Sequence, residues 1–455
     1  MEVIIVGSGI SGVTLAITLS RYRNVKVTIF EKTTELRNVG NGLQIPCNSS
    51  HTMRCLGLLD KLRALAKQAA TSFRSLTYDG KVVLDRNLRV YEELYGAPWL
   101  LLHRADYLHM LLDEARRLGV VLKSGCQVTD VDFSAPSVTL ENGEVYNADL
   151  IVGADGIHSR IRSVMHPSIR AVPTGEYAYR GLFEQWKFSS NPSLQHLVSS
   201  PDVVRLWRGP RANAVLYPLQ GGKLFNFVIP ISDTAFNEAC TKSDKSLLDS
   251  VKERLRDWDP LLLEVLGQAD QLIRFPLYQV PELPSWSRGS VALIGDAAHA
   301  MLPHLAQGAA TAVEDGFVLG TLLGRWAQDH LSARPEDNTP AVRRRKIQTL
   351  LRSYENIQRE RITRIASCSR WTGTLEHLPS GPDQRARDAE FAAFDPYHPE
   401  SCVSGLPWID GRWNRELLGR KADQVTEREF KRVVDGWKLE AEQQVRGDGY
   451  GRARL

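Results

Sequence analysis

The sequence predicts an α/β protein in which a Rossmann-like domain holds an inserted, mainly antiparallel β-sheet and is followed by a helical C-terminal segment. Three observations support this fold class. Residues 1–32 read as a strand, a glycine-rich turn, a helix and a second strand. Two further apolar runs end in Gly-Ala-Asp or Gly-Asp turns near residues 153 and 295. Strand-like runs dominate residues 173–278, which indicates a separate sheet.

The composition is that of a water-soluble globular protein with two or three domains. The 455 residues are 43% hydrophobic and 24% charged, and the net charge is +4. This mild charge does not favour nucleic-acid binding, and no apolar run approaches the roughly 18 residues of a transmembrane helix. Because the first strand begins at residue 2, no signal peptide is expected. We therefore expect a cytoplasmic protein that is a monomer or a homodimer.

The cysteines and histidines do not predict a metal site. The six cysteines are scattered without a C-x-x-C pair, and no Cys and His lie at the spacing of a zinc site. Free thiols in a reducing compartment are the expected state.

The first element is a dinucleotide-binding fingerprint. An apolar strand at residues 3–6 runs into Gly7-Ser8-Gly9-Ile10-Ser11-Gly12, and a helix over 10–22 and a strand closing on Glu31 follow. Gly7 permits the tight turn, Gly9 lets the backbone approach a pyrophosphate, and Gly12 lets the helix pack closely. Glu31 is placed to accept hydrogen bonds from ribose hydroxyls. The alternative is an ordinary βα turn that binds no ligand. The fingerprint does not distinguish binding of NAD, NADP or FAD.

The next segments alternate short strands and helices. Residues 40–46 are too rich in Gly, Asn and Pro for a helix and are expected to cross the nucleotide as a loop and extended segment. Residues 49–67 have helical periodicity, and residues 73–85 form two strands around Asp79-Gly80. Residues 99–104 lead into a helix over 105–118. Residues 119–147 indicate a small antiparallel group with an Asn142-Gly143 turn.

The remaining elements complete the predicted order. Residues 148–152 form a second buried strand, and a strand of the same type returns at 291–294. Between them we expect strands at 177–187, 202–208, 212–217 and 223–230, and a helical pair near 246–267. Long helices are predicted over about 308–327 and 341–366. Residues 378–413 read as an extended wrap before a helical tail.

Two aspartates follow predicted strand ends. Asp155 lies in GADGIHSRIR at 153–162, and Asp296 lies in GDAAHA at 295–300. Each is also a reasonable helix cap, which is the structural alternative. Gln307, Gly308 and Ala309 then open a helix with little side-chain bulk, so its free backbone N–H groups suit a ligand that becomes anionic.

Together these signatures resemble the single-component FAD-dependent aromatic hydroxylases (group A flavoprotein monooxygenases). GSGISG at 7–12, GADGIHSRIR at 153–162 and GDAAHAMLP…QG at 295–308 match the three ordered signatures of that family. Residues 1 to about 370 resemble its salicylate hydroxylase-like branch, and the chain looks closest to fungal secondary-metabolite monooxygenases. The resemblance implies a Rossmann-like FAD-binding domain, with departures at Asn41, Cys47 and Ala310 beside the expected substrate.

The resemblance also implies a set of cofactor-binding residues. Gly7, Gly9, Gly12 and Glu31 would hold the ADP half of FAD. Arg104 would reach the pyrophosphate and ribityl region, although an exposed Arg at a helix start often makes only a surface ion pair. Asp155 belongs to the signature associated with FAD and NAD(P)H, and Asp296 would bind the ribityl and pyrophosphate region. The flavin ring would meet Pro303, Gly308 and Ala309, and the expected site also includes Arg37, Gly42 and Val128.

Four segments are expected from this assignment. Residues 1–172 would form the first part of the FAD-binding domain, with a small β insertion at 73–99. Residues 173–289 would form the substrate-binding sheet, residues 290–370 the second part of the FAD-binding domain, and residues 371–455 a helical and extended wrap.

The implied reaction uses NADPH or NADH and O2. A flavin C4a-hydroperoxide would hydroxylate or epoxidise an electron-rich aromatic or indole-type small molecule. Arg180 is predicted to bind a phenolate or carboxylate or to donate a proton, and Tyr217 to hydrogen-bond or tune the substrate. An Arg180 ion pair on the sheet surface and a Tyr217 in the core are the alternatives. Trp207 and Phe227 are candidates for an apolar wall, with core packing favoured, and His51 is a weaker candidate base.

Other functions stay open at this level. An FAD-dependent oxidase or dehydrogenase would use the same cofactor site without inserting oxygen. A salicylate-type catabolic hydroxylase, a flavin-bound regulatory protein without turnover, and a plain NAD dehydrogenase are further alternatives. A Ser-His-Asp hydrolase is not favoured, because no G-x-S-x-G follows a predicted strand.

Overall fold

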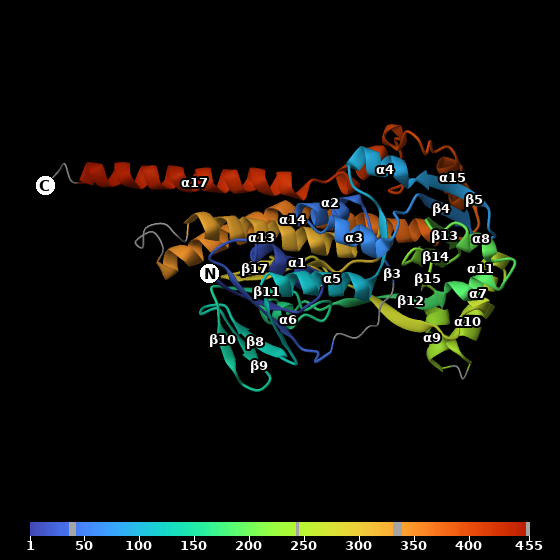
Figure 1. Cartoon of the computed structure of the whole chain (residues 1–455), viewed down its shortest axis with the longest axis horizontal. Coiled ribbons are helices and arrows are strands. Elements are labelled where there is room, and N and C mark those ends of the chain that lie inside the picture. The colour runs from blue at the N-terminus through green and yellow to red at the C-terminus, as the bar shows by residue number, and fades with distance from the viewer. Residues whose placement is uncertain (36–41, 243–244, 331–338, 452–455) are drawn as a thin grey trace.

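Two large β-sheets form the framework of the protein (Figure 1). The computed structural model describes residues 1–35, 42–242, 245–330 and 339–451. Within these ranges no helix is both long enough and apolar enough to span a membrane.

The first sheet has six strands in the order β17-β18-β11-β1-β2-β7. Its strands are β1 (Glu2–Val6), β2 (Lys26–Glu31), β7 (Val121–Ser124), β11 (Leu150–Gly153), β17 (Ser287–Arg288) and β18 (Val291–Leu293). All neighbours are parallel except the short pair β17 and β18. The central strands are buried on both faces, as their apolar runs require.

Helices cover this sheet, and the closest pair is α1 (Ile10–Leu19) and α13 (Gly308–His330). Three glycines of α13, one per turn, make the close approach possible. A Cβ at Gly316 would lie 2.7 Å from the Leu15 nitrogen, and a Cβ at Gly320 would lie 2.6 Å from the Thr18 Cβ. Gly324 faces the ring of Tyr22 in the same way. α5 (Arg104–Arg117) and α14 (Pro340–Glu376) pack beside this pair.

The second sheet has seven strands in the order β16-β12-β15-β14-β13-β4-β5. They are β4 (Ser72–Thr77), β5 (Val82–Asn87), β12 (Val172–Glu184), β13 (Val203–Gly209), β14 (Ala212–Leu219), β15 (Leu224–Ile231) and β16 (Ile273–Gln279). All pairs are antiparallel except β13 and β4. A separate apolar core joins its strands to five short helices, namely α7 (Gln185–Ser189), α8 (Gln195–Val198), α9 (Thr234–Lys242), α10 (Leu247–Arg254) and α11 (Pro260–Gly267).

Two smaller sheets complete the β-structure of the described residues. β8 (Val128–Asp132), β9 (Ser137–Leu140) and β10 (Val145–Asn147) form an antiparallel group. β3 (Gly42–Ile45) pairs with β6 (Leu100–His103) and also reaches the second sheet, where the Gly42 N–H donates to Asn226 Oδ1 at 2.7 Å. This bond ties the extended segment to the second sheet.

The remaining helices border the two sheets. They are α2 (Cys47–Cys55), α3 (Leu59–Ala66), α4 (Leu88–Tyr95), α6 (Arg160–Met165), α12 (Asp296–His299), α15 (Pro382–Ala392), the 3-10 turn η2 (Pro399–Ser401), α16 (Gly411–Leu418) and α17 (Ala422–Gly451). The C-terminal segment packs Trp408 against Phe73 of β4, with ring centroids 4.8 Å apart. α17 starts against α2 and then extends past the rest of the molecule (Figure 1).

The predicted α/β fold class is confirmed, and four details differ from expectation. The helix after the fingerprint ends at Leu19 rather than near residue 22. Residues 49–67 divide into α2 and α3, because Gly57 adopts a positive φ of 66° between them. The strands at 72–87, expected within the first domain, belong to the second sheet, where β5 is an edge strand and β4 lies between β5 and β13. Residues 378–413, expected to be an extended wrap, contain α15 and the start of α16. The division into four segments stays a prediction.

Candidate active site

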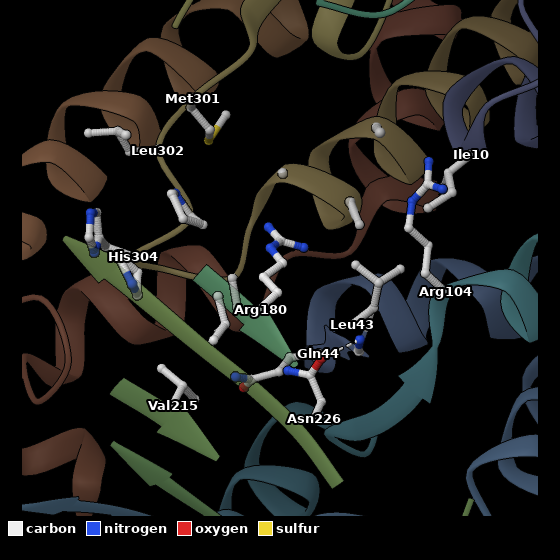
Figure 2. A pocket seen from close by; sticks show the side chains of 18 of the residues that line it. Ile10, Leu43, Gln44, Arg104, Arg180, Val215, Asn226, Met301, Leu302 and His304 are labelled. Atoms are coloured by element: carbon white, nitrogen blue, oxygen red, sulfur yellow. Dashed lines mark hydrogen bonds between the residues drawn. The ribbon is translucent and has the colours of Figure 1, made fainter. Parts of the chain in front are cut away.

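A cavity of about 450 Å³ lies between the first sheet, the second sheet and the start of α13 (Figure 2). Its lining combines glycine backbone, apolar side chains and a few charged groups. The charged groups are Arg104, Arg180, Asp296, His304 and Glu376. A concave and mostly apolar cavity with a few polar groups is the usual form of a cofactor and substrate site.

The glycine turn forms one wall of this cavity. Gly7 has a φ of 107°, and a Cβ there would strike the Ala154 carbonyl. A Cβ at Gly12 would strike the Gly7 carbonyl, so both positions exclude a side chain for packing reasons. Gly9 differs, because no atom lies within 4 Å of its Cβ position, and it lines the cavity. The turn therefore leaves open space at the position where a ligand phosphate can approach the start of α1.

Glu31 ends β2 behind this turn. Its Oε2 accepts from the Ser8 N–H and hydroxyl at 2.9 Å each, and its Oε1 accepts from Thr33. Burial opposes ionisation, but these hydrogen bonds outweigh it and lower the pKa of Glu31. Glu31 is therefore an ionised acceptor that also fixes the turn. It does not itself line the cavity.

Asp155 acts first as a helix cap. Its Oδ2 accepts from the N–H groups of Arg160 and Ile161 at 2.7 and 3.1 Å. Its Oδ1 is buried without a hydrogen-bond partner among the described residues, and burial raises the pKa of Asp155. Asp155 therefore has the helix-capping role that was the alternative to ligand binding, at the start of α6. Its neighbours Ala154 and Gly156 line the cavity, whereas Asp155 does not.

Arg162, from the same signature, supports the loop that carries Asp296. Its side chain is fully buried, and its Nη1 donates to the Ala297 carbonyl at 2.9 Å. Asp315 of α13 holds the other side of the loop, since its Oδ2 accepts from the Gly295 N–H at 2.8 Å and lies 2.6 Å from His299 Nε2. Arg162 from the 153–162 signature and Asp315 from α13 therefore brace the loop that carries Asp296.

Asp296 presents its carboxylate to the cavity. The residue is exposed there, although protein encloses it on all other sides and this burial raises its pKa. The start of α13 lies in the same cavity, and a Cβ at Gly308 would meet no atom within 4 Å. Pro303 and Ala309 also line it. A hydrogen-bond acceptor and an open helix N-terminus therefore face the same space.

Arg104 begins α5 and extends into the cavity beside Ile10 (Figure 2). In the described ranges its guanidinium takes part in no ion pair or hydrogen bond. The surface ion pair that was the alternative for Arg104 is therefore not formed with any described residue. Its unpaired charge fits a ligand phosphate.

These features fit FAD. The glycine turn and Arg104 offer room and positive charge for a pyrophosphate. Asp296 offers an acceptor for ribityl hydroxyls, and the open N-terminus of α13 offers donors for an anionic isoalloxazine edge.

Arg180 and Tyr217 reach the cavity from the second sheet. Arg180, on β12, points its guanidinium toward the start of α13 (Figure 2), and its buried Nε has no hydrogen-bond partner among the described residues. Burial lowers the pKa of Arg180. Tyr217, on β14, packs beside Gly42 and is almost fully buried, and burial raises its pKa. Arg180 forms no ion pair with any residue that the structure describes, whereas Tyr217 belongs to an apolar core and also lines the cavity.

A buried charge cluster closes the far end of the cavity, and sequence reasoning missed it. His304 Nδ1 lies 2.9 Å from Glu376 Oε2, and His304 Nε2 lies 3.3 Å from Glu176 Oε2. Burial alone would lower the pKa of His304, but the two carboxylates raise it to about 9. Glu376 Oε1 also accepts from the Trp408 indole at 3.2 Å. His304 could have been singled out from the sequence, because it directly follows Pro303, a predicted flavin contact. Its partners Glu176 and Glu376 could not, because they lie 128 and 72 residues away in the sequence.

Other predicted positions lie elsewhere. Val128 is buried in the core at the start of β8 and does not line the cavity. Trp207 and Phe227 belong to the core of the second sheet, so the packing alternative holds for both. His51 lies on α2 beside Asp423, outside the cavity. Arg37 lies outside the described residues.

Comparison with known proteins agrees with this geometry. Residues 1–352 match the family described as "FAD binding domain". The chain is 33% identical over 424 residues to the FAD-dependent monooxygenase OpS4 of Beauveria bassiana, covering 90% of this chain and 95% of that protein. It is 33% identical to the 3-amino-4-hydroxybenzoate 2-monooxygenase PtmB3 of Streptomyces platensis, covering 85% and 91%.

A solved structure shows the same fold. The salicylate hydroxylase substrate complex superposes with a TM-score of 0.71 at 22% identity, covering 94% of this chain and 98% of that one. The fold, the match over most of the chain and the cavity lead to one assignment. The chain belongs to the FAD binding domain family and is an FAD-dependent monooxygenase.

Proposed function

We propose that the protein uses NADPH or NADH and O2 to hydroxylate or epoxidise an electron-rich aromatic or indole-type small molecule. FAD, when bound, supplies redox chemistry between the nicotinamide and O2. The observation that carries the proposal is the unpaired guanidinium of Arg180 inside the same cavity as Asp296 and the start of α13. The name of one relative, 3-amino-4-hydroxybenzoate 2-monooxygenase, supports a phenolic substrate class.

The chain's own residues would divide the work along the cavity. Arg104, Asp296 and the backbone at Gly9 and Gly308 would bind and orient FAD. Arg180 would attract a phenolate or carboxylate, because a buried, unpaired guanidinium gains most from an anionic partner.

The far end of the cavity would complete the substrate site. The apolar side chains of Leu206, Val215 and Met301 would exclude water from the reacting carbon. Tyr217 and the His304–Glu376 pair would supply hydrogen bonds to a polar substituent.

Product analysis tests this function directly. The FAD-loaded protein is incubated with NADPH or NADH and isotopically labelled O2, with a panel of phenols, indoles, salicylate and 3-amino-4-hydroxybenzoate. We expect one class of compound to stimulate NAD(P)H oxidation and to gain a labelled oxygen atom, measured by mass spectrometry.

The same experiment separates the alternatives. An oxidised product without labelled oxygen would indicate an FAD-dependent oxidase or dehydrogenase and contradict the proposal. Efficient conversion of salicylate would favour the catabolic type of hydroxylase. NAD(P)H oxidation that no compound stimulates would also count against the proposal.

A further inference from the structure

A group of three potential metal ligands lies outside the lining of the cavity, where α17 begins. His51 and Cys55 are four residues apart on α2, so they share one face of that helix. Asp423 stands in the first turn of α17. His51 Nε2 lies 3.0 Å from Asp423 Oδ1 and 3.6 Å from Cys55 Sγ, and all three ligand atoms lie within 4.8 Å of one another.

We propose that His51, Cys55 and Asp423 form a binding site for one Zn²⁺ ion that joins α2 to α17. Zinc bonds of about 2.3 Å to sulfur, about 2.0 Å to imidazole nitrogen and about 2.0 Å to carboxylate oxygen set the required spacing. At tetrahedral angles they place sulfur and nitrogen about 3.6 Å apart, and nitrogen and oxygen about 3.3 Å apart. The measured separations of 3.6 and 3.0 Å are close to both values.

A simple ion pair explains less of this geometry. An imidazole N–H on His51 can donate well to one acceptor, and Asp423 would satisfy it. Cys55 Sγ nevertheless approaches the same nitrogen, so both groups converge on His51 Nε2. The three potential ligand atoms therefore lie close enough together, within 4.8 Å of one another, for a single ion to contact all of them.

The charges and surroundings also suit zinc. A thiolate and a carboxylate would neutralise the two positive charges of the ion. The His51 side chain is 12% exposed and that of Asp423 is 42% exposed, so a fourth position remains open to water. Because the thiolate is the form that ligates a metal, Zn²⁺ must displace the thiol proton of Cys55 on binding.

The ion would reinforce the attachment of the C-terminal helix. Just before Asp423, Lys421 donates to the Tyr95 carbonyl, and Arg420 Nε lies 3.3 Å from Glu314 Oε2 of α13. A metal between α2 and α17 would add a third link at this point. We therefore assign it a structural role, separate from the oxidation chemistry.

Metal titration of the untagged, FAD-loaded, full-length protein tests the site. After dialysis against a chelator, ZnCl2 is added and bound zinc is measured by calorimetry and elemental analysis. We expect one ion per chain and a Tm higher by about 2 °C or more at saturation. Added Co²⁺ should give a thiolate charge-transfer band in the difference absorption spectrum.

Variants identify the ligands. Cys55→Ser should lose the cobalt band and bind Zn²⁺ at least tenfold more weakly, and Asp423→Asn should also bind more weakly. Cys126→Ser, which removes another partly exposed free thiol, should behave like the parent protein. Circular dichroism and FAD content confirm that each variant is folded. A parent protein that binds no Zn²⁺ at micromolar concentration, or a Cys55→Ser variant that binds it equally well, would overturn the proposal.

Discussion

Two charged side chains with no hydrogen-bond or ion-pair partner among the described residues, Asp296 and Arg180, face the cavity from opposite sheets. Arg180 Nε is buried without a partner, which is costly, and the exposed Asp296 carboxylate opens onto the cavity, so each is positioned for a ligand. Their different surroundings suggest different ligands. Asp296 lies beside the glycine turn and the start of α13, whereas Arg180 lies among the apolar residues of the second sheet.

The Asp296→Asn variant should retain less FAD. The amide keeps the size of the carboxylate but loses its charge and strong acceptor, so we expect about tenfold to hundredfold weaker binding. Flavin per chain after gel filtration, and reconstitution of apoprotein followed by flavin fluorescence, measure the effect. Asp130→Asn, at an exposed position on β8, serves as the control. Equal FAD affinity in both variants would remove Asp296 from the cofactor site.

The Arg180→Ala variant should keep FAD and lose turnover of the substrate identified by product analysis. Removing a buried charged partner costs about 1.5–3 kcal/mol, which lowers kcat/KM about tenfold to hundredfold. Arg180→Lys should recover part of this loss, because it restores the charge without the planar donors. Steady-state kinetics beside Arg89→Ala, an exposed position on α4, provide the comparison. Unchanged kinetics in Arg180→Ala would exclude the residue from the substrate site.

At the level of elements, the packing of α1 on α13 brings two helix N-termini to the cavity. Gly9 precedes α1, and Gly308 begins α13. The glycines at 316, 320 and 324 set the distance between the helices, since side chains there would meet α1 or Tyr22. Small residues in an interior helix are thus required for the geometry of the cofactor site.

Gly320→Ala should therefore destabilise the protein despite the higher helix propensity of alanine. The added methyl would lie 2.6 Å from Thr18, and overpacking of this kind costs about 1–3 kcal/mol. FAD affinity should fall with stability, because both N-termini shift. Denaturant unfolding and FAD titration measure the two effects.

The matched control is Gly436→Ala on α17, where no atom lies within 4 Å of the added methyl. This substitution should be neutral or stabilise by up to about 1 kcal/mol. If the two variants proved equally stable, the proposed packing role of Gly320 would be wrong.

The elements differ in how far the sequence predicts them. α1, β2 and β11 follow from local patterns, because each is a short apolar run, and glycine-rich turns precede α1 and follow β11. The place of β4 in the second sheet depends on parallel pairing with β13, about 130 residues later, which no local pattern encodes. His304 with Glu176 and Glu376 is a similar case, since three single residues meet only through the tertiary fold. The open space beside Gly9, by contrast, was predictable, because Gly9 is the second glycine of the G-x-G-x-x-G turn.

At the level of the whole molecule, two buried histidines make stability depend on pH in opposite directions. The pKa of His304 is raised to about 9, so its stabilising contribution is complete below about pH 6.5 and is lost as pH rises through 9. Burial and the nearby His304 charge lower the pKa of His377 to about 3. His377 therefore stays neutral in the fold, and stability falls as pH drops below about 6.5.

The free energy of unfolding should therefore be greatest near pH 6.5. Urea unfolding of the FAD-saturated protein between pH 5 and about 9.5 measures the profile. His304→Gln should flatten the alkaline side, which amounts to at most about 3 kcal/mol, and His377→Gln should flatten the acidic side. Profiles of the parent and His304→Gln that run parallel above pH 7 would contradict this account.

The order of strands in the first sheet has a consequence for synthesis on the ribosome. β11 ends at Gly153, but its neighbour β18 begins only at Val291, after the whole second sheet has been made. At about 5–20 residues per second, the edge of β11 waits roughly 7–28 s for its partner. The first half of the pyrophosphate site is thus translated long before Asp296 and α13 exist. Cofactor loading is therefore an event of the nearly complete chain, and a nascent chain released before residue 308 would carry an open sheet edge and no flavin.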